Sequence, residues 1–416
     1  MHVVLHDYSG HPFQVQLSRE LAQRGHHVRH QYCTSYTTGK GAVERRPEDP
    51  AGFSVDPLCT AGEFARYSPI RRMFQELRYG VTLARRLRSS PPEVVVMCNI
   101  PLLAHAVVAT VLRLSKITMV FWQQDVYSDA IGTAARARLG HLVGGTLAWI
   151  ADRIERFIAR SSVQVIAISE NFREVLQRWG VLSRAMTILP NWAALPEMPV
   201  RPRDNKWAYA HDLVGRSVVL YSGTLGLKHD PHIFVELATA LGELDPGARL
   251  VVVSQGQGRG LLEQERSRLQ LDNLVLLDYQ PYESLPDVLA SADVLVTVLE
   301  PDAGRFSVPS KVLNYLCAGR PVLGVMPVQN EAAMTLLTSG AGVVVDPGDY
   351  RDAVAQLSEL LAAPKRRTVM GAAGRRYAER TFDIAAIAAQ FESVLREAVE
   401  PDANDRLVAT SRAAAS

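Results

Sequence analysis

Two lysines at the starts of predicted helices could bind a negatively charged group. Lys228 ends a glycine-containing loop that follows an apolar strand. Lys311 follows Pro309 and Ser310, two residue types that suit the start of a helix. Asn314 lies one helical turn further on the same face. Because free amides at a helix start favour negative charge, the pattern predicts an anion site. The alternative for each lysine is a surface position beside an ordinary turn or capped helix.

Two loops in the second half of the chain contain glycines that would let the backbone approach a phosphate closely. Each loop follows an apolar strand and precedes a predicted helix. The residues that begin the two loops are Ser222, Gly223, Thr224, Ser254, Gln255 and Gly256. The second loop also imitates a dinucleotide-binding fingerprint, with Asp278 at the end of the next strand. Leu261 replaces the third glycine of that fingerprint, which argues against a nicotinamide-dependent oxidoreductase.

An aspartate follows a predicted strand in the first half of the chain. Asp125 comes after the apolar segment 119–122 and two glutamines. A carboxylate at the end of a strand could orient or deprotonate an acceptor hydroxyl. The alternative is a structural aspartate that caps its own loop.

Strands and helices alternate along the chain, and this order determines where the loops lie. Predicted strands in the first half occupy 3–5, 27–32, 94–98, 117–122 and 163–168. After a proline-rich linker at 190–204, further strands are predicted at 217–221, 249–254, 274–277, 294–298, 321–325 and 342–345. Buried strands that alternate with helices predict parallel sheets covered on both faces. Ligands of such folds bind beyond the carboxyl ends of the strands.

The sequence therefore predicts an α/β protein of two facing Rossmann-like doubly wound domains with a cleft between them. Residues 1–195 would form the first domain and residues 205–383 the second. A helix at 384–399 could pack back on the first domain, and residues 400–416 would be a disordered tail. The four cysteines show no metal-ligand spacing and no acidic pair indicates a Mg²⁺ site, so no metal or other cofactor is expected.

Positive charge is concentrated in the first half of the chain. Residues 1–199 carry a net charge of +7, and residues 200–416 a net charge of −5. Arginines alternate with apolar residues in 64–88 and 136–160, which is typical of helices on an anionic membrane surface. No nucleic-acid motif, secretory signal or bilayer-spanning apolar run is present. We therefore expect a cytoplasmic protein that binds the inner face of the cell membrane and no nucleic acid. The alternative is an ordinary solvated, arginine-rich face.

Five segments together resemble glycosyltransferase family 4, over roughly residues 2–398. The segments are 9–10 with 21–28, 168–170 with 190–192, 222–224 with Lys228, 292–294, and 310–322. The chain is especially similar to bacterial fucosyl- or N-acetylfucosaminyl-transferases that build capsule, O-antigen or colanic-acid units. The resemblance implies a GT-B fold and a nucleoside diphosphate sugar donor, UDP-linked in our interpretation. It also implies transfer with retention, without a divalent metal, to a saccharide or lipid-linked acceptor hydroxyl. In such an enzyme the first domain would bind the acceptor and the second the nucleotide sugar.

The residues and the resemblance together predict the site. Asp125, Lys228 and Lys311 would be catalytic. The donor-binding residues would be Gly10, Ser222, Gly223, Thr224, Ser254, Gln255, Gly256, Tyr279, Pro309, Ser310 and Asn314. Phe306 and Asn314 replace two glutamates of the family, and Thr224 replaces a frequent arginine. The alternative function is therefore a non-catalytic protein that binds a sugar nucleotide.

Overall fold

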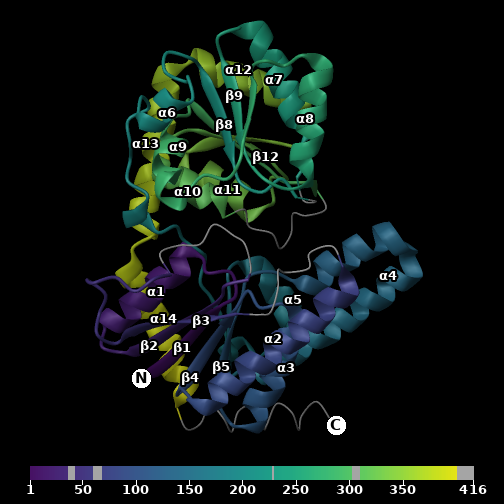
Figure 1. Cartoon of the computed structure of the whole chain (residues 1–416), viewed down its shortest axis with the longest axis vertical. Helices are drawn as coiled ribbons and strands as arrows, with labels where there is room; N and C mark the ends of the chain where they lie inside the picture. Colours follow the sequence, from purple (N-terminus) through teal and green to yellow (C-terminus); the bar gives the residue numbers. More distant parts are fainter. Residues whose placement is uncertain (36–42, 60–67, 227–228, 302–309, 401–416) are drawn as a thin grey trace. The chain divides into compact units, whose positions relative to one another are not determined.

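The protein folds into two compact units, each built on its own parallel β-sheet (Figure 1). The structure is a computed structural model that describes residues 1–35, 43–59, 68–226, 229–301 and 310–400. Unit 1 contains Met1–Asn191 and the chain from Ile384 onward, and unit 2 contains Trp192–Asp383. The predicted tail lies outside the described residues from residue 401.

Unit 1 contains a seven-stranded sheet in the order β3-β2-β1-β4-β5-β6-β7, in which all neighbouring strands are parallel. Its strands are β1 (His2–Asp7), β2 (His27–Cys33), β3 (Phe53–Leu58), β4 (Val94–Cys98), β5 (Thr118–Gln123), β6 (Gln164–Ala167) and β7 (Met186–Ile188). Strands β4 and β5 are buried along their whole length, as expected for a parallel sheet covered on both faces. Because β1, β4 and β5 are adjacent and parallel, the loops that follow them meet at one edge.

Five helices of unit 1 come from the first half of the chain, and one returns from its end. They are α1 (Pro12–Gln23), α2 (Pro69–Ser89), α3 (Leu102–Leu114), α4 (Tyr127–Ser161), α5 (Arg173–Arg178) and α14 (Ile384–Val399). Helix α14 packs against α1 and β5 (Figure 1). The fully buried ring of Phe391 lies 4.7 Å from that of Trp122. Glu392 pairs with Arg24 at 2.7 Å, so α14 is an integral part of unit 1.

Unit 2 contains a six-stranded parallel sheet in the order β10-β9-β8-β11-β12-β13. Its strands are β8 (Val218–Ser222), β9 (Arg249–Val253), β10 (Leu274–Leu277), β11 (Val294–Val298), β12 (Val322–Val325) and β13 (Gly342–Val345). Its helices are α6 (Lys206–Ala210), α7 (His232–Leu244), α8 (Gln257–Leu269), α9 (Leu285–Ala290), α10 (Lys311–Ala318), α11 (Glu331–Ser339), α12 (Tyr350–Ala362) and α13 (Pro364–Thr381). The predicted parallel sheets are thus confirmed in both halves.

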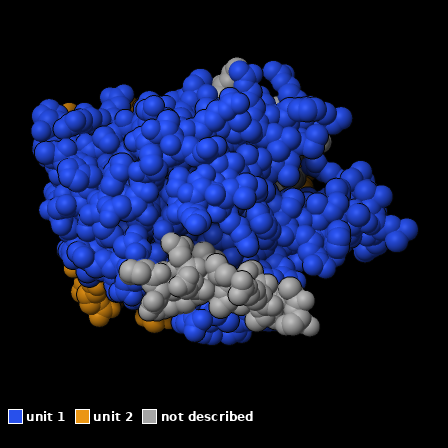
Figure 2. Space-filling view, turned by 90° about the horizontal axis from the view of Figure 1, so that it is seen from below, with its two compact units in different colours: residues 1–191, 384–416 blue, residues 192–383 orange. Residues whose placement is uncertain are grey.

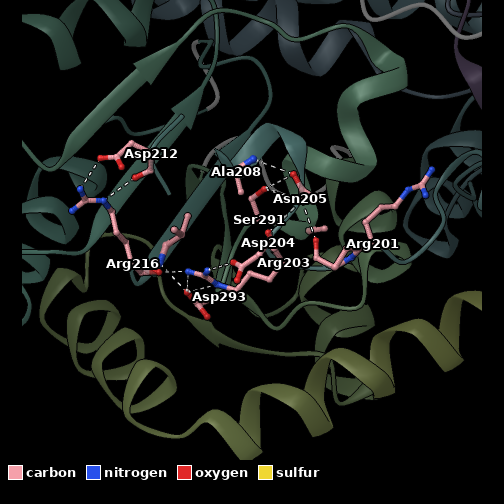
Figure 3. A network of polar contacts seen from close by, with 12 residues as sticks. Arg201, Arg203, Asp204, Asn205, Ala208, Asp212, Arg216, Ser291 and Asp293 are labelled. Carbon is pink, nitrogen blue, oxygen red and sulfur yellow. Dashed lines mark hydrogen bonds and ion pairs between the residues drawn. The ribbon is translucent and has the colours of Figure 1, made fainter. Parts of the chain in front are cut away.

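The predicted linker at 190–204 is anchored to unit 2 at its carboxyl end by a polar network (Figure 3). Arg203 bonds to Asp293 through Nη2 at 3.0 Å and through Nε at 3.2 Å. The same carboxylate accepts from the amide of Val218 at 2.9 Å. Asn205 donates to the hydroxyl of Ser291 at 3.1 Å and caps α6. The boundary between the two units lies at residues 191–192, before this anchored segment.

Candidate functional site

Two loops of unit 2 are joined beyond the carboxyl ends of β8 and β9. The amide of Leu225 donates to the carbonyl oxygen of Gln255 at 3.1 Å and to the hydroxyl of Ser254 at 3.0 Å. Gly256 has φ 115°, and a Cβ at this position would lie 2.6 Å from the carbonyl oxygen of Leu225. Only glycine therefore allows the two loops to approach so closely.

Ser254, a predicted donor-binding residue, lies inside the protein. Its side chain is fully buried, and its hydroxyl also donates to the carbonyl oxygen of Gln255 at 3.2 Å. Since the hydroxyl is buried and both accepts and donates a hydrogen bond inside the protein, Ser254 holds the two loops together. Gln255 and Gly256, by contrast, are exposed.

Lys311 extends from the first turn of α10 toward the end of β8. Its Nζ donates to the Tyr221 hydroxyl at 2.6 Å and lies 4.4 Å from the centre of that ring. Nζ also lies 3.3 Å from Nε2 of His229. The surrounding protein desolvates the ammonium and lowers its pKa to about 7. A Cβ at Gly223 would lie only 3.0 Å from Cε of Lys311, so the lysine stem lies directly against the glycine loop.

Three tyrosines join α10, the first loop and the segment after β10. Tyr315 accepts from the amide of Ser222 at 2.9 Å and donates to the carbonyl oxygen of the same residue at 3.2 Å. The Tyr221 hydroxyl donates to the carbonyl oxygen of Thr224 at 2.8 Å. The hydroxyl of Thr224 is hydrogen-bonded to that of Tyr279. The structure thus brings together five predicted residues, namely Ser222, Gly223, Thr224, Tyr279 and Lys311.

The remaining predictions in unit 2 have mixed outcomes. Ser310 is exposed at the cap position of α10, without a side-chain cap hydrogen bond. Asn314 is half-buried on the same helix, and its side chain makes no hydrogen bond to the part of the chain that the structure describes. Lys228, Phe306 and Pro309 lie outside the described residues.

His229 is a member of the cluster that the sequence did not indicate. Its Nδ1 accepts from the amide of Gly226 at 3.3 Å, which leaves Nε2 toward Lys311. The only signal in the sequence was its position beside Lys228.

Unit 1 contains a second polar cluster, at the carboxyl ends of β1, β4 and β5. The fully buried carboxylate of Asp7 lies 3.5 Å from Nδ1 of His11, whose side chain is 35% exposed. Asn99, which follows β4, donates to Asp7 at 3.1 Å. Burial alone would raise the pKa of Asp7, but His11 and the Asn99 hydrogen bond hold it below its ordinary value. The sequence pattern did not indicate this cluster.

Asp125 and Gly10 also belong to this edge of unit 1. Asp125 is half-buried directly after β5, and its charge contributes to raising the pKa of His11. Gly10 has φ 75° in the turn before α1, a left-handed conformation that favours glycine. Gln124 donates to the side chain of Asn191 at 3.2 Å, which ties the loop after β5 to the end of unit 1.

Comparisons of the sequence with protein families agree with the division of the chain into two units. Residues 11–192 match the family described as Glycosyl transferase 4-like domain, and residues 207–377 match Glycosyl transferases group 1. One similar protein is a GDP-mannose-dependent monoacylated alpha-(1-6)-phosphatidylinositol monomannoside mannosyltransferase of Corynebacterium glutamicum. It is 31% identical over 32% of this chain and 35% of its own length.

A second similar protein is a GDP-mannose-dependent alpha-(1-6)-phosphatidylinositol monomannoside mannosyltransferase of Mycolicibacterium smegmatis. It is 27% identical over 58% of this chain and 63% of its own length. The chain therefore matches less than two thirds of each of these relatives.

Solved structures share the fold at low sequence identity. Sucrose-phosphate synthase from Thermosynechococcus elongatus superimposes with a TM-score of 0.72, at 17% identity over 95% of this chain and 98% of that one. Anabaena Alr3699/HepE in complex with UDP-glucose gives a TM-score of 0.69, at 16% identity over 95% and 99%. These likenesses confirm the predicted GT-B-type pair of Rossmann-like units. Each half of the chain thus matches the model of a glycosyltransferase domain family, the first half the Glycosyl transferase 4-like domain and the second half the Glycosyl transferases group 1.

Proposed function

We propose that this protein is a retaining glycosyltransferase that moves a sugar from a nucleoside diphosphate sugar to an acceptor hydroxyl. The cluster around Lys311 is the observation that supports this function best. Its ammonium lies against a glycine loop, beside the start of α10, in surroundings that desolvate it. A preorganised positive charge in such a place stabilises a diphosphate as it leaves the sugar.

The base of the nucleotide is the first point to test. We propose UDP as the nucleotide of the donor. GDP is the main alternative, because the two mannosyltransferase relatives named above depend on GDP-mannose. A ligand at 100 times its dissociation constant stabilises the folded protein by about 2.7 kcal/mol. Thermal unfolding with UDP, GDP and their sugar derivatives should therefore reveal the donor.

Transfer must then be measured directly, by mass spectrometry of the product. Binding of a sugar nucleotide without hydrolysis or transfer would favour the non-catalytic alternative. That alternative is motivated by the sequence, in which Asn314 stands where the family often has a glutamate.

We further propose that the acceptor is a lipid-linked oligosaccharide in the assembly of a bacterial surface polysaccharide such as capsule or O-antigen. Both mannosyltransferase relatives are named for phosphatidylinositol mannosides, which are also saccharides on lipids. A lipid-linked acceptor would require the protein to work at the surface of the inner membrane. No helix in the described ranges is long and apolar enough to cross a membrane.

Helices α2 and α4 carry an exposed surface that suits peripheral binding to anionic lipid. Both helices pack against α3. The exposed apolar residues of this α2/α4 surface are Ile70, Met73, Phe74, Leu77, Val81, Leu139, Leu142, Val143, Leu147, Trp149 and Ile150. Exposed arginines lie between them, among them Arg71, Arg78, Arg85, Arg138 and Arg153.

Helix α4 forms the projecting part of this surface. Gly140 has φ 79° and turns α4 back on itself as a hairpin. The two arms pack closely, since a Cβ at Gly144 would lie 2.5 Å from the backbone nitrogen of Arg136. Leu142, which is 90% exposed, lies next to the turn of this hairpin, which projects on the right in Figures 1 and 2. Apolar side chains at such a tip could enter the headgroup region.

We expect the protein to float with liposomes that contain anionic lipid. Each basic residue near the surface contributes about 1 kcal/mol. The attraction is screened beyond about 10 Å at 0.1 M salt, so high salt should weaken binding. Insertion of apolar side chains into the headgroup region should leave some binding that high salt does not remove. The double substitution Leu142→Ser and Trp149→Ser should abolish this salt-resistant binding.

Leu244→Ser is the matched control for this experiment. Leu244 is 58% exposed on α7 of unit 2, outside the proposed surface, so the substitution should leave flotation unchanged. Flotation that ignores lipid charge, or equal loss in the control, would reject the α2/α4 surface as the docking site.

We also expect EDTA to leave the rate of transfer largely intact. The positive charge at the leaving diphosphate would come from Lys311 and Lys228 instead of a divalent ion. Among the described residues, no group of three or more histidines, cysteines or acids has the geometry to hold a metal. Loss of transfer in EDTA that Mg²⁺ or Mn²⁺ restores would contradict this expectation.

A further inference from the structure

His229 and Lys311 face each other in unit 2 through nitrogens that cannot both be donors. Nε2 of His229 lies 3.3 Å from Nζ of Lys311. The backbone around the histidine is held on both sides. Its amide donates to the carbonyl oxygen of Gly226 at 3.1 Å, and the carboxylate of the next residue, Asp230, accepts from the hydroxyl of Tyr350. Two nitrogens form a hydrogen bond only if one carries a hydrogen and the other offers a lone pair.

The hydrogen bond at the other ring nitrogen decides where His229 carries its hydrogen. The backbone amide of Gly226 donates to Nδ1 at 3.3 Å. A ring nitrogen that accepts has no hydrogen of its own, so the neutral imidazole carries its hydrogen on Nε2. Because Nε2 is the nitrogen that faces Lys311, His229 is the donor of this pair.

Lys311 can accept this hydrogen bond only as an uncharged amine. An ammonium has three hydrogens and no lone pair, whereas an amine has two hydrogens and one lone pair. The hydroxyl of Tyr221 donates its single hydrogen to the carbonyl oxygen of Thr224 at 2.8 Å, so it accepts from Nζ at 2.6 Å. The lone pair of the amine then accepts from Nε2 of His229. Each donor in this series of hydrogen bonds is thus matched by an acceptor.

The electrostatic surroundings also favour the uncharged amine. Within the described part of the chain no carboxylate pairs with Lys311, and burial lowers its pKa to about 7. Tyr221 and Tyr315 are the titratable groups that β8 and α10 contribute to the cluster. Both are uncharged at neutral pH, because burial raises their pKa. The nearby carboxylate of Asp230 is already engaged by the hydroxyl of Tyr350.

A bound diphosphate reverses this preference. Its charged oxygens favour the ammonium, so Nζ takes up a proton from solvent and loses its lone pair. The hydrogen on Nε2 of His229 then needs a new acceptor, which a phosphate oxygen supplies. We propose that His229 holds Lys311 as an uncharged amine in the unliganded protein and becomes a second donor to the diphosphate of the sugar nucleotide once that lysine is charged. The inference rests on the proposed function and involves residues of unit 2 alone.

The wild-type protein without nucleotide provides the first test. The chain has six lysines, so the NMR signal of each ε-carbon can be assigned by substitution. Lys311 should titrate with a pKa of about 7, far below that of the exposed Lys365. The nitrogen NMR shifts of His229 should show that its hydrogen is on Nε2. A hydrogen on Nδ1, or a Lys311 that titrates like Lys365, would overturn the pairing.

The substitution His229→Leu separates the hydrogen bond from burial. Leucine keeps the site apolar and filled but has no N–H group, so burial alone would leave the pKa of Lys311 low or lower it further. Loss of the donor to the amine should instead raise this pKa from about 7 to about 8. His232→Leu is the matched control, because His232 is exposed at the start of α7. An unchanged or lower pKa in His229→Leu, or an equal rise in the control, would overturn the role of His229.

Calorimetry with UDP and GDP, in buffers of different ionisation enthalpy, tests the response to the diphosphate. At pH 8 the wild type should take up about one proton per nucleotide, and His229→Leu about half as much, because half of its Lys311 is already charged. At pH 6 the lysine is charged in both proteins, so the variant should bind about 10-fold more weakly through loss of the second donor alone. Equal proton uptake, or equal affinity at pH 6, would contradict the proposal.

Failure of the proposed function would give a different result. If neither UDP, GDP nor their sugar derivatives bind the wild type, unit 2 has no sugar-nucleotide site and the response of His229 to a diphosphate falls with it. The titration of Lys311 in the unliganded protein would still decide whether His229 is its donor.

Discussion

Replacing Lys311 by alanine is expected to lower sugar transfer by 10²- to 10³-fold. The substitution removes a positive charge that lies between Tyr221, His229 and the glycine loop, where the charge of the leaving diphosphate develops. Removing one preorganised group that stabilises a developing charge typically lowers the rate by about 10²- to 10³-fold. The measurement is single-turnover transfer with saturating donor, which separates chemistry from binding.

Two variants make this result interpretable. Lys365→Ala removes an exposed lysine from α13 of the same unit and should be as active as the wild type. Lys228→Ala should slow transfer by about 10²-fold if that lysine supplies the second charge. Near-normal turnover of both Lys228→Ala and Lys311→Ala would show that the diphosphate binds elsewhere.

Donor affinity should depend on pH through the same lysine. The free protein holds the pKa of Lys311 at about 7, because burial disfavours the ammonium. A diphosphate favours the charged form, so binding should raise this pKa and take up a proton at pH 8. The dissociation constant for UDP or GDP should therefore increase as pH rises above 7. Lys311→Ala should lose this dependence, and an unchanged slope would contradict the assignment of the titrating group.

Asp293→Ala is expected to destabilise unit 2 by about 3 kcal/mol. The Asp293 side chain is only 15% exposed and bonds to Arg203, Arg367 and the amide of Val218. Removing it leaves a partly buried guanidinium without its main partner (Figure 3). Chemical denaturation of the full chain, followed by a probe in unit 2, measures the loss.

Asp204→Ala provides the control for this prediction because the same guanidinium is involved. Asp204 contacts Nη1 of Arg203 at 2.9 Å, but its side chain is 52% exposed. An exposed ion pair contributes less than about 1 kcal/mol, so this variant should unfold almost like the wild type. Equal effects of the two substitutions would mean that the network in Figure 3 does not anchor the linker.

The strands that could be predicted are those that form apolar runs. Val94–Cys98 is continuously apolar and Val294–Val298 is apolar except for Thr297, and the structure has strands with the same bounds. Strands β3 and β7 were missed because neither has a clear apolar pattern: β3 contains Asp56 and Pro57, and β7 has only three residues. An edge strand is half-solvated, so β3 accommodates Asp56 and Pro57, which local pattern assigns to turns.

Residues of the candidate site could be predicted where they lie close together in the sequence, and not where they are far apart. Ser222, Gly223, Thr224 and Lys311 could be predicted because strand, glycine turn and helix start follow one another in sequence. The pair of Asp7 and His11 could not, since Asn99 reaches it from 92 residues away and the pKa shifts depend on burial. The residue type of Ser254 could not show that its hydroxyl makes hydrogen bonds inside the protein.

The return of α14 to unit 1 has a consequence for the order of events during synthesis. Unit 2 is one continuous stretch of chain, whereas the aromatic ring of Trp122 lacks its neighbour Phe391 until α14 leaves the ribosome. Unit 1 therefore starts to be translated before unit 2 and is completed after it, and its nascent form exposes an apolar strip that chaperones can bind. A truncation that ends the chain at the boundary between the units would preserve this immature state permanently.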